Sequence, residues 1–221
     1  MRALPLLLIA LFPLGLPAAE ALDLAPVKKW IAKQSDFRAV VADFKQTRSL
    51  RALRSPLAST GRLWFAAPNS FRWEVGEPAK TVVLRKGDTI HVIQPEKKKA
   101  ERSLAGKGGK PSPAQAFAMM QFPLATDWAD FQRQFEVLAV ETEGTRCHLE
   151  VLPRDPQARK FLNALKMDFN TSNGQLLSFE LATKDGSSLR NEFSNVQVNP
   201  KIDRAVFEYD LTGYKVVDAR Q

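Results

Sequence analysis

GRLWFAAPNSFRWEV, residues 61–75, contains two short runs in which large apolar side chains alternate with small or polar ones. A period of two places alternate residues on the same face of a β-strand. A proline and an asparagine lie between the runs and are typical of a turn. The stretch therefore predicts two antiparallel strands with one apolar face, whose side chains are Leu63, Phe65, Phe71, Trp73 and Val75.

The same period recurs along most of the chain, and the connections are short, which favours antiparallel neighbours. Three short helices are also expected: about ten residues behind Asp23, one from a capping box at Ser112, and one from Asp155 with Phe161, Leu162 and Leu165 on one side. We predict a mainly β (α+β) domain with about ten strands. Further strands are expected from residue 37 onward and at 80–85, 89–94, 132–140, 147–152, 166–170, 176–182, 188–193 and 205–209.

Residues 1–21 have the pattern of a cleavable signal peptide. Arg2 gives a positive start, an apolar run spans residues 4–16, and Ala19-Glu20-Ala21 fits the cleavage rule. We therefore expect residues 22–221 to form a single domain in an extracytoplasmic space. No cysteine lies near the expected cut, so we expect no lipidation there.

The composition argues against disorder, metal chemistry and catalysis. The hydrophobic share is 44%, and the chain has one cysteine and two histidines. Cys147 and His148 are adjacent on an expected strand, so their side chains point to opposite faces. Glu141 and Glu143 are interpreted as solvated charges. We expect no catalytic residue, no metal site and no cofactor.

The formal net charge is +8, and half of it lies in residues 96–110. We predict a mobile surface loop there, with Lys97, Lys98, Lys99 and Arg102 as candidate docking residues for an anionic partner. A solvated turn is the alternative. No aromatic residues are interleaved with the lysines, and the expected secretion also argues against a nucleic-acid partner.

The aromatic residues favour a binding role. Phe44 precedes the cluster at 61–75 by one strand, and Phe117 and Met120 lie on the helix expected after Ser112. The chain has 14 phenylalanines against 2 tyrosines, which suits an apolar ligand better than a sugar or a peptide. The alternative is an ordinary sandwich core.

Residues 37–95 resemble the LolA-type carriers of outer-membrane lipoproteins. The matching features are Phe44-Lys45-Gln46, then Gly61-Arg62-Leu63-Trp64-Phe65, then Pro68-Asn69-Ser70-Phe71-Arg72-Trp73, then Pro78, Gly87 and Pro95. The resemblance implies a strongly curved, incomplete antiparallel barrel of about eleven strands, with helices closing its mouth. It also implies a periplasmic shuttle that receives lipoproteins from an inner-membrane ABC exporter and passes them to an outer-membrane acceptor. We expect the protein to be a monomer.

On this resemblance Phe71 and Trp73 fall on the family's cavity wall. Alternation adds Leu63 and Phe65, the preceding strand adds Phe44, and the expected lid helix adds Phe117 and Met120. One departure is clear: Ala66-Ala67 stand where better-known members carry an arginine that ties the lid. Two alternatives remain open, a carrier of another lipid-like cargo such as a glycolipid or polyene ester, and a periplasmic protein-binding adaptor.

Overall fold

A computed structural model describes residues 22–104, 125 and 127–218 of the chain. The expected signal peptide and the helix expected from Ser112 lie outside the described residues. Within them, twelve strands form one sheet in the order β12-β6-β5-β4-β3-β2-β1-β11-β10-β9-β8-β7. The strands are β1 (Ala39–Ser49), β2 (Leu57–Ala66), β3 (Ser70–Val75), β4 (Thr81–Lys86), β5 (Thr89–Gln94), β6 (Lys99–Leu104), β7 (Phe135–Glu143), β8 (Arg146–Pro153), β9 (Leu162–Asn170), β10 (Leu176–Thr183), β11 (Ser188–Val198) and β12 (Lys215–Asp218).

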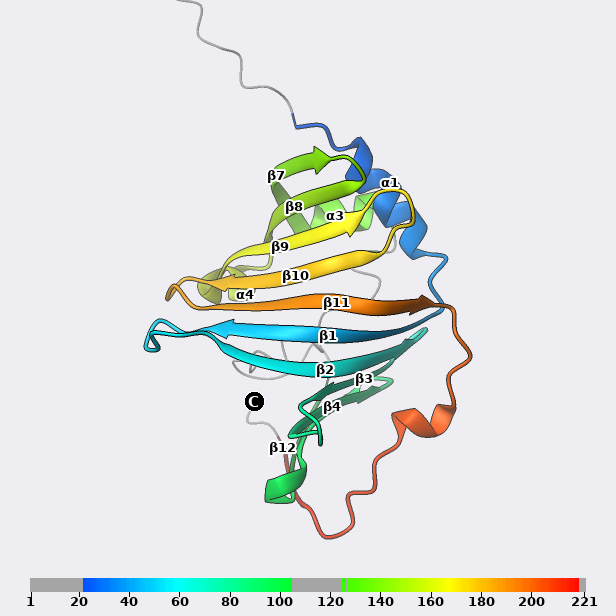
Figure 1. Cartoon of the computed structure of the whole chain (residues 1–221), viewed down its shortest axis with the longest axis vertical. Helices are drawn as coiled ribbons and strands as arrows, with labels where there is room; N and C mark the ends of the chain where they lie inside the picture. Colours follow the sequence, from blue (N-terminus) through cyan, green and yellow to red (C-terminus); the bar gives the residue numbers. More distant parts are fainter. Residues whose placement is uncertain (1–21, 105–124, 126, 219–221) are drawn as a thin grey trace, which may run out of the picture.

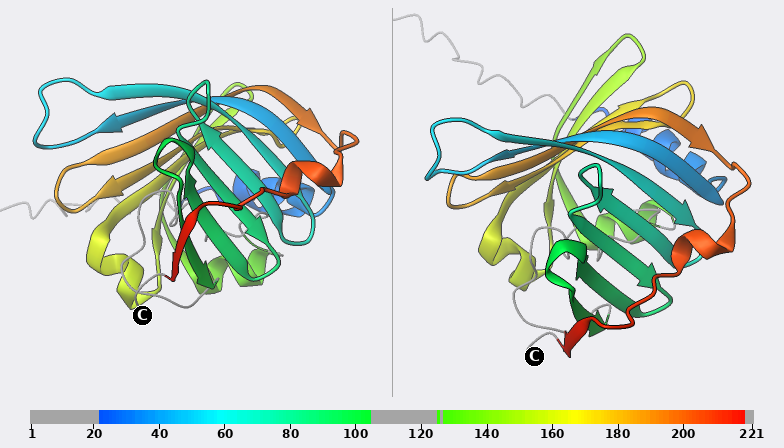
Figure 2. Two further views of the ribbon diagram at one scale, coloured as in Figure 1. Left: turned by 90° about the horizontal axis from the view of Figure 1, so that it is seen from below. Right: turned by 60° about the horizontal axis from the view of Figure 1, so that its bottom comes forward.

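The sheet is open and strongly curved (Figures 1 and 2). Consecutive strands from β1 to β6 and from β7 to β11 are antiparallel neighbours, and β1 joins the two meanders by pairing with β11. The expected mainly β, curved antiparallel architecture is confirmed, with twelve strands in place of about eleven. The additional strand, β12, lies parallel to β6.

The helical elements are α1 (Ala25–Gln34), α3 (Trp128–Gln134), α4 (Pro156–Phe161) and the 3₁₀ turns η1 (Pro95–Lys97) and η2 (Arg204–Phe207). Helix α1 begins where expected. The Asp23 carboxylate accepts a hydrogen bond from the backbone N–H of Ala25 at 2.9 Å. Leu24 occupies the N-cap position itself and makes no side-chain cap. No helix in the described part of the chain is long and apolar enough to cross a membrane.

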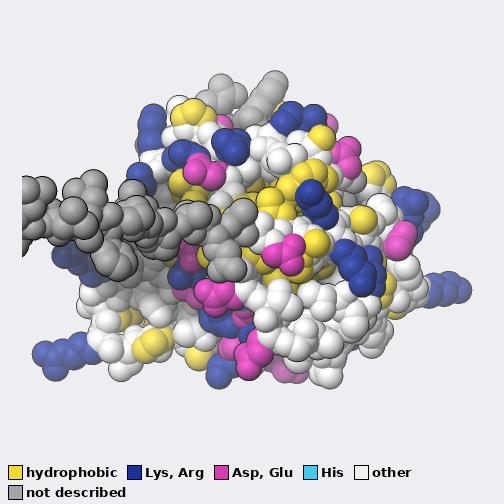
Figure 3. Space-filling model, turned by 90° about the horizontal axis from the view of Figure 1, so that it is seen from above, with side chains coloured by type: hydrophobic (Ala, Val, Ile, Leu, Met, Phe, Trp, Pro, Cys, Tyr) yellow, Lys and Arg dark blue, Asp and Glu magenta, His cyan; other side chains and the backbone are white. Residues whose placement is uncertain are grey.

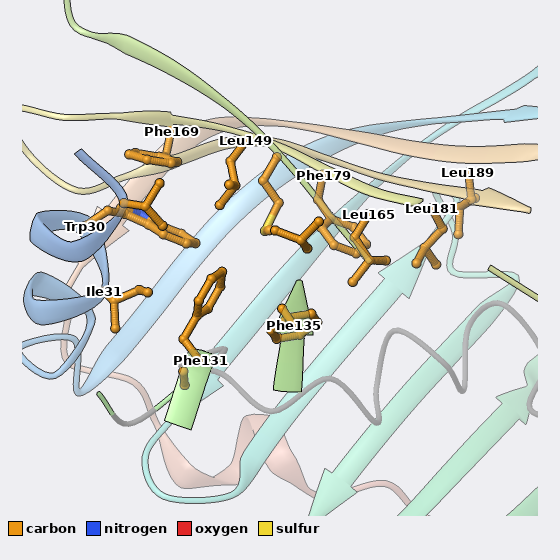
Figure 4. Close-up of a cluster of buried hydrophobic side chains, with 14 of the residues drawn as sticks. Trp30, Ile31, Phe131, Phe135, Leu149, Leu165, Phe169, Phe179, Leu181 and Leu189 are labelled. Atoms are coloured by element: carbon orange, nitrogen blue, oxygen red, sulfur yellow. The ribbon is translucent and has the colours of Figure 1, made fainter. Parts of the chain in front are cut away.

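Helices α1 and α3 lie on the concave side of the sheet beside β7–β10 (Figures 1 and 4). Trp30 of α1 stacks on Phe169 of β9 with ring centroids 4.5 Å apart, and its indole N–H donates to the Gly174 carbonyl at 3.0 Å. Phe131 of α3 is fully buried. Figure 4 shows these rings meeting the aliphatic side chains that β8–β11 direct toward them. The protein's own side chains therefore fill this half of the concave face.

The C-terminal segment crosses the opposite, convex face over β3–β5 (Figure 2). Phe207 of η2 is 5% exposed and packs on a second cluster beneath it. The cluster's buried strand residues are Val82, Leu84, Ile93 and Ala100. The β2–β6 half of the sheet thus has apolar contacts on both faces, which explains the nearly continuous apolar sequence of β4.

Two expected strands are helical in the structure. Residues 132–134, expected in a strand, end α3, because the Asp127 carboxylate accepts from the Asp130 N–H at 2.8 Å and begins a helix that buries Phe131. Residues 205–209 do not form a strand. The Asp203 carboxylate accepts from the Ala205 N–H at 2.9 Å, which starts the 3₁₀ turn η2.

Two further expectations need correction. Helix α4 ends at Phe161, and Leu162 and Leu165 belong to β9, so the shared helical side predicted for these three residues does not exist. The predicted loop at 96–110 is partly strand. Its described part contains η1 and then β6, because Lys99–Leu104 pairs with β5 on one side and carries β12 on the other.

Candidate binding site on the concave face

An apolar pocket lies on the concave face where β1, β2, β3 and β11 meet the end of α1. Its volume is about 40 Å³. Among the described residues that line it, the polar ones are both glutamines. The lining residues are Gln34, Phe37, Val40, Ala42, Leu63, Phe65, Phe71, Gln175, Leu176, Phe193, Val196 and Val198.

Strand register builds the pocket wall. Val40 of β1 lies opposite Val198 of β11 on one side and Phe65 of β2 on the other, and Phe65 lies opposite Phe71 of β3. These four side chains therefore form one apolar row across four strands. Ala42 and Leu63 form part of the next row. The small side chain of Ala42 leaves space between larger neighbours.

Phe44 and Trp73 form the adjoining part of the concave face. Their rings stack with centroids 3.8 Å apart, and Phe193 meets Trp73 edge-on at 6.4 Å. Gly61, opposite Phe44 on β2, makes this possible. A Cβ at Gly61 would lie 2.3 Å from Phe44 Cζ and 2.0 Å from the Glu74 carbonyl oxygen. The ring of Phe44 thus occupies the space above a residue with no side chain.

The structure brings together all the described residues expected in the cavity. Leu63, Phe65 and Phe71 line the pocket, while Phe44 and Trp73 pack beside it. Phe117 and Met120 lie outside the described residues, and their cavity role stays a prediction. The β11 side of the pocket was not predicted. The strand expected at 188–193 continues in the structure to Val198, through a register shift against β1.

The pocket is small for a lipid. Its volume of about 40 Å³ compares with roughly 300–1,000 Å³ for typical ligand sites. Phe65, Trp73 and Leu63 are each less than 9% exposed, so side chains fill most of the space around it. Admission of a long apolar chain therefore requires the lining side chains to move.

The polar side chains of β8–β11 form a separate network on the convex face. The Asp168 carboxylate accepts hydrogen bonds from Arg146 at 2.7 Å, His148 at 2.8 Å and Ser178 at 2.7 Å. Burial alone would raise the pKa of the Asp168 carboxyl, but these hydrogen bonds hold it well below its usual range. Arg190 adds an ion pair at 3.3 Å. The network is consistent with a structural role.

Cys147 and His148 point to opposite faces, as expected. Cys147 is fully buried in the concave core, and burial is the main cause that raises the pKa of its thiol. His148 faces Asp168 on the convex side. The two therefore do not form a nucleophile and base pair. Among the described residues, no group of three histidine, cysteine, aspartate or glutamate side chains is placed to hold a metal ion.

The candidate docking residues are split between a turn and a strand. Lys97 ends η1 and Lys98 follows it in a left-handed conformation, while Lys99 and Arg102 lie on β6. Arg102 pairs with Asp218 of β12 at 2.8 Å. Figure 3 shows a different face, on which basic side chains are spread with acidic ones among them. The docking role of the four residues stays a prediction.

Comparison with known proteins supports one family. Residues 35–210 match the family described as "Outer membrane lipoprotein carrier protein LolA". The outer-membrane lipoprotein carrier protein of Chromobacterium violaceum is 26% identical over 207 residues, 93% of this chain and 92% of that protein. The carrier protein of Dechloromonas aromatica is 26% identical over 173 residues, 78% of this chain and 77% of that protein.

A solved structure shares the fold. The crystal structure of an uncharacterized conserved protein from Thermus thermophilus has a TM-score of 0.52 at 8% identity, and the match covers 87% of this chain and 96% of that one. The family match spans most of the chain, including all the described residues predicted to line the cavity. The chain therefore belongs to the LolA family of outer-membrane lipoprotein carrier proteins.

Proposed function

We propose that this protein is a periplasmic carrier that shelters the acyl chains of lipoproteins on its concave face and moves them from the inner to the outer membrane. The apolar pocket between β1, β2, β3 and β11 carries the proposal. The names of the two relatives, both outer-membrane lipoprotein carrier proteins, agree with it. An inner-membrane ABC exporter and an outer-membrane acceptor, which the family resemblance implies, are part of the same proposal.

The small size of the pocket suits a carrier that must release its cargo. Each methylene moved out of water contributes about 0.8 kcal/mol, so three chains with roughly fifteen buried methylenes each would contribute on the order of 35 kcal/mol. Non-covalent affinities saturate near about −18 to −21 kcal/mol. Displacing the packed side chains on loading offsets part of the gain, which keeps the cargo releasable.

The test is native mass spectrometry of the chain purified without detergent from its own periplasm. We expect the wild-type protein to retain an acylated lipoprotein. In Val40→Trp, the larger side chain fills the pocket that Val40 lines, so retention should fall at least tenfold. Lys45→Trp is the matched control, because Lys45 is exposed on the opposite face of β1.

The two variants separate loss of the site from loss of the fold. Near-ultraviolet circular dichroism checks that each variant keeps its tertiary packing. If the wild-type protein retains lipid that carries no polypeptide, its cargo is another lipid-like molecule and not a lipoprotein. A wild-type protein that retains neither lipid nor lipoprotein, or a Val40→Trp variant that retains cargo as well as Lys45→Trp, would contradict the proposal.

A further inference from the structure

The concave face carries a buried cation beside the pocket. Arg85 of β4 lies opposite Phe71 of β3, which lines the pocket, and opposite Ile90 of β5, which belongs to the concave core. Arg85 and Val83 are two residues apart on β4, so the Arg85 side chain points to the concave face, as that of Val83 does. Arg85 is only 6% exposed. An arginine side chain cannot shed its charge in a protein, so a full positive charge is held there.

The hydrogen bonds of Arg85 are largely unused. Its Nε–H donates to the Gly87 carbonyl at 3.0 Å, and its terminal nitrogens donate to no described residue. Glu101 occupies a nearby inward position of β6, opposite Val92. No carboxylate among the described residues pairs with the Arg85 guanidinium, and burial of an unpaired charge is costly because it removes stabilising water.

A second polar group lies in the same cross-strand row. Ser103 of β6 is opposite Ile90, two strands beyond Arg85, and it is 8% exposed. Its hydroxyl oxygen is buried and has no hydrogen-bond partner among the described residues. The row therefore runs from apolar side chains at the pocket to two polar residues toward β6, of which Ser103 has the unsatisfied hydroxyl. This order of apolar and polar side chains along the row is complementary to an amphiphile, in which an apolar chain is followed by a polar group.

We propose that Arg85 is an anion-binding residue of the carrier: its guanidinium binds an oxyanion, phosphate or carboxylate, of an amphiphile whose acyl chain occupies the pocket. The inference rests on the proposed function, since the acyl chain must enter the pocket for its polar end to reach Arg85. An oxyanion supplies the charge that the described residues do not, and it accepts charge-assisted hydrogen bonds from the guanidinium. Ser103 supplies a further donor for the same polar end.

The test compares amphiphiles that share one chain and differ in the polar end: dodecanol, dodecanoate and dodecyl phosphate. Calorimetry below the micelle concentration, at a pH where the carboxyl is ionised, gives each affinity for the full protein. We expect the two anions to bind the wild-type protein at least tenfold more tightly than dodecanol. A stronger preference for phosphate or for carboxylate identifies the source of the oxyanion.

The Arg85→Met variant should lose this preference and keep its affinity for dodecanol, while Arg85→Lys should keep most of it. Lys86→Met is the matched control, because it removes the same charge from the exposed neighbour that pairs with Glu208 on the convex side. Equal binding of anions and dodecanol to the wild-type protein would overturn the inference alone. If Arg85→Met has a lowered melting temperature but still prefers the anions to dodecanol, the inference about Arg85 is also overturned. If the wild-type protein binds none of the amphiphiles, the proposed function is contradicted as well.

Discussion

The absence of a side chain at Gly61 permits a close aromatic stack on the concave face. Phe44 covers Gly61 and stacks on Trp73 at 3.8 Å. A methyl group at this position would overlap the Phe44 ring and the Glu74 carbonyl oxygen. We expect Gly61→Ala to lower the free energy of unfolding by about 1–3 kcal/mol through overpacking. Urea denaturation followed by tryptophan fluorescence measures the change.

Ser59→Ala is the control for this substitution, because Ser59 is exposed on the same strand. Its effect should stay within about 0.5 kcal/mol. Equal stability of the two variants would show that β2 and Phe44 can relax around the added methyl. The sequence could place Gly61 in a strand but could not reveal this contact, because it depends on the partner that β1 presents across the ladder.

The C-terminal segment is an element whose docking can be followed through its tyrosines. Tyr209 and Tyr214, the two tyrosines of the chain, have hydroxyl oxygens 3.1 Å apart. Burial, followed by the hydrogen bond with Tyr214, raises the pKa of Tyr209 to about 12. We expect the absorbance of phenolate to show Tyr209 ionising near that value in the folded protein and near about 10 in urea.

The direction of the pH effect on stability follows from the raised pKa. The folded state holds this proton more tightly, so the stabilisation is complete below the unfolded pKa of about 10 and is lost as the pH rises toward 12. Tyr214→Phe leaves Tyr209 as the only tyrosine and should lower its pKa, while burial keeps that pKa above 10. Ionisation of Tyr209 at its ordinary pKa in the folded wild-type protein would contradict the docking.

Elements with strong local signals were predictable, and those that depend on distant contacts were not. The β4–β5 hairpin follows from alternation around a glycine turn, and the predicted span of β5 at 89–94 is confirmed. Helix α3 was missed because its apolar residues also fit a strand, and the helix is favoured by the burial of Phe131 in the concave core. Strand β12 has only four residues and forms against the edge of β6.

At the scale of the whole molecule, the two halves of the concave face are packed differently. Beside β7–β10, the aromatic side chains of α1 and α3 pack against the concave face of the sheet (Figure 4). Beside β1–β3 and β11, a pocket remains and its rim aromatics, Phe37, Phe71 and Phe193, are only partly buried. The sequence indicated an apolar face but could not divide it, because the division depends on where the helices lie against the sheet.

This division predicts that stability and binding can be changed separately. Phe131 is fully buried in the filled half, so Phe131→Ala should lower the free energy of unfolding by about 3–5 kcal/mol. Its affinity for dodecanol, measured by calorimetry where the variant is still folded, should change less than twofold. Phe71→Ala, in the pocket wall, should cost less stability because the ring is only half-buried, and it should weaken dodecanol binding about tenfold through lost apolar contact. Equal losses of affinity in the two variants would mean that the concave face acts as one cooperative site and that the filled half also takes part in binding.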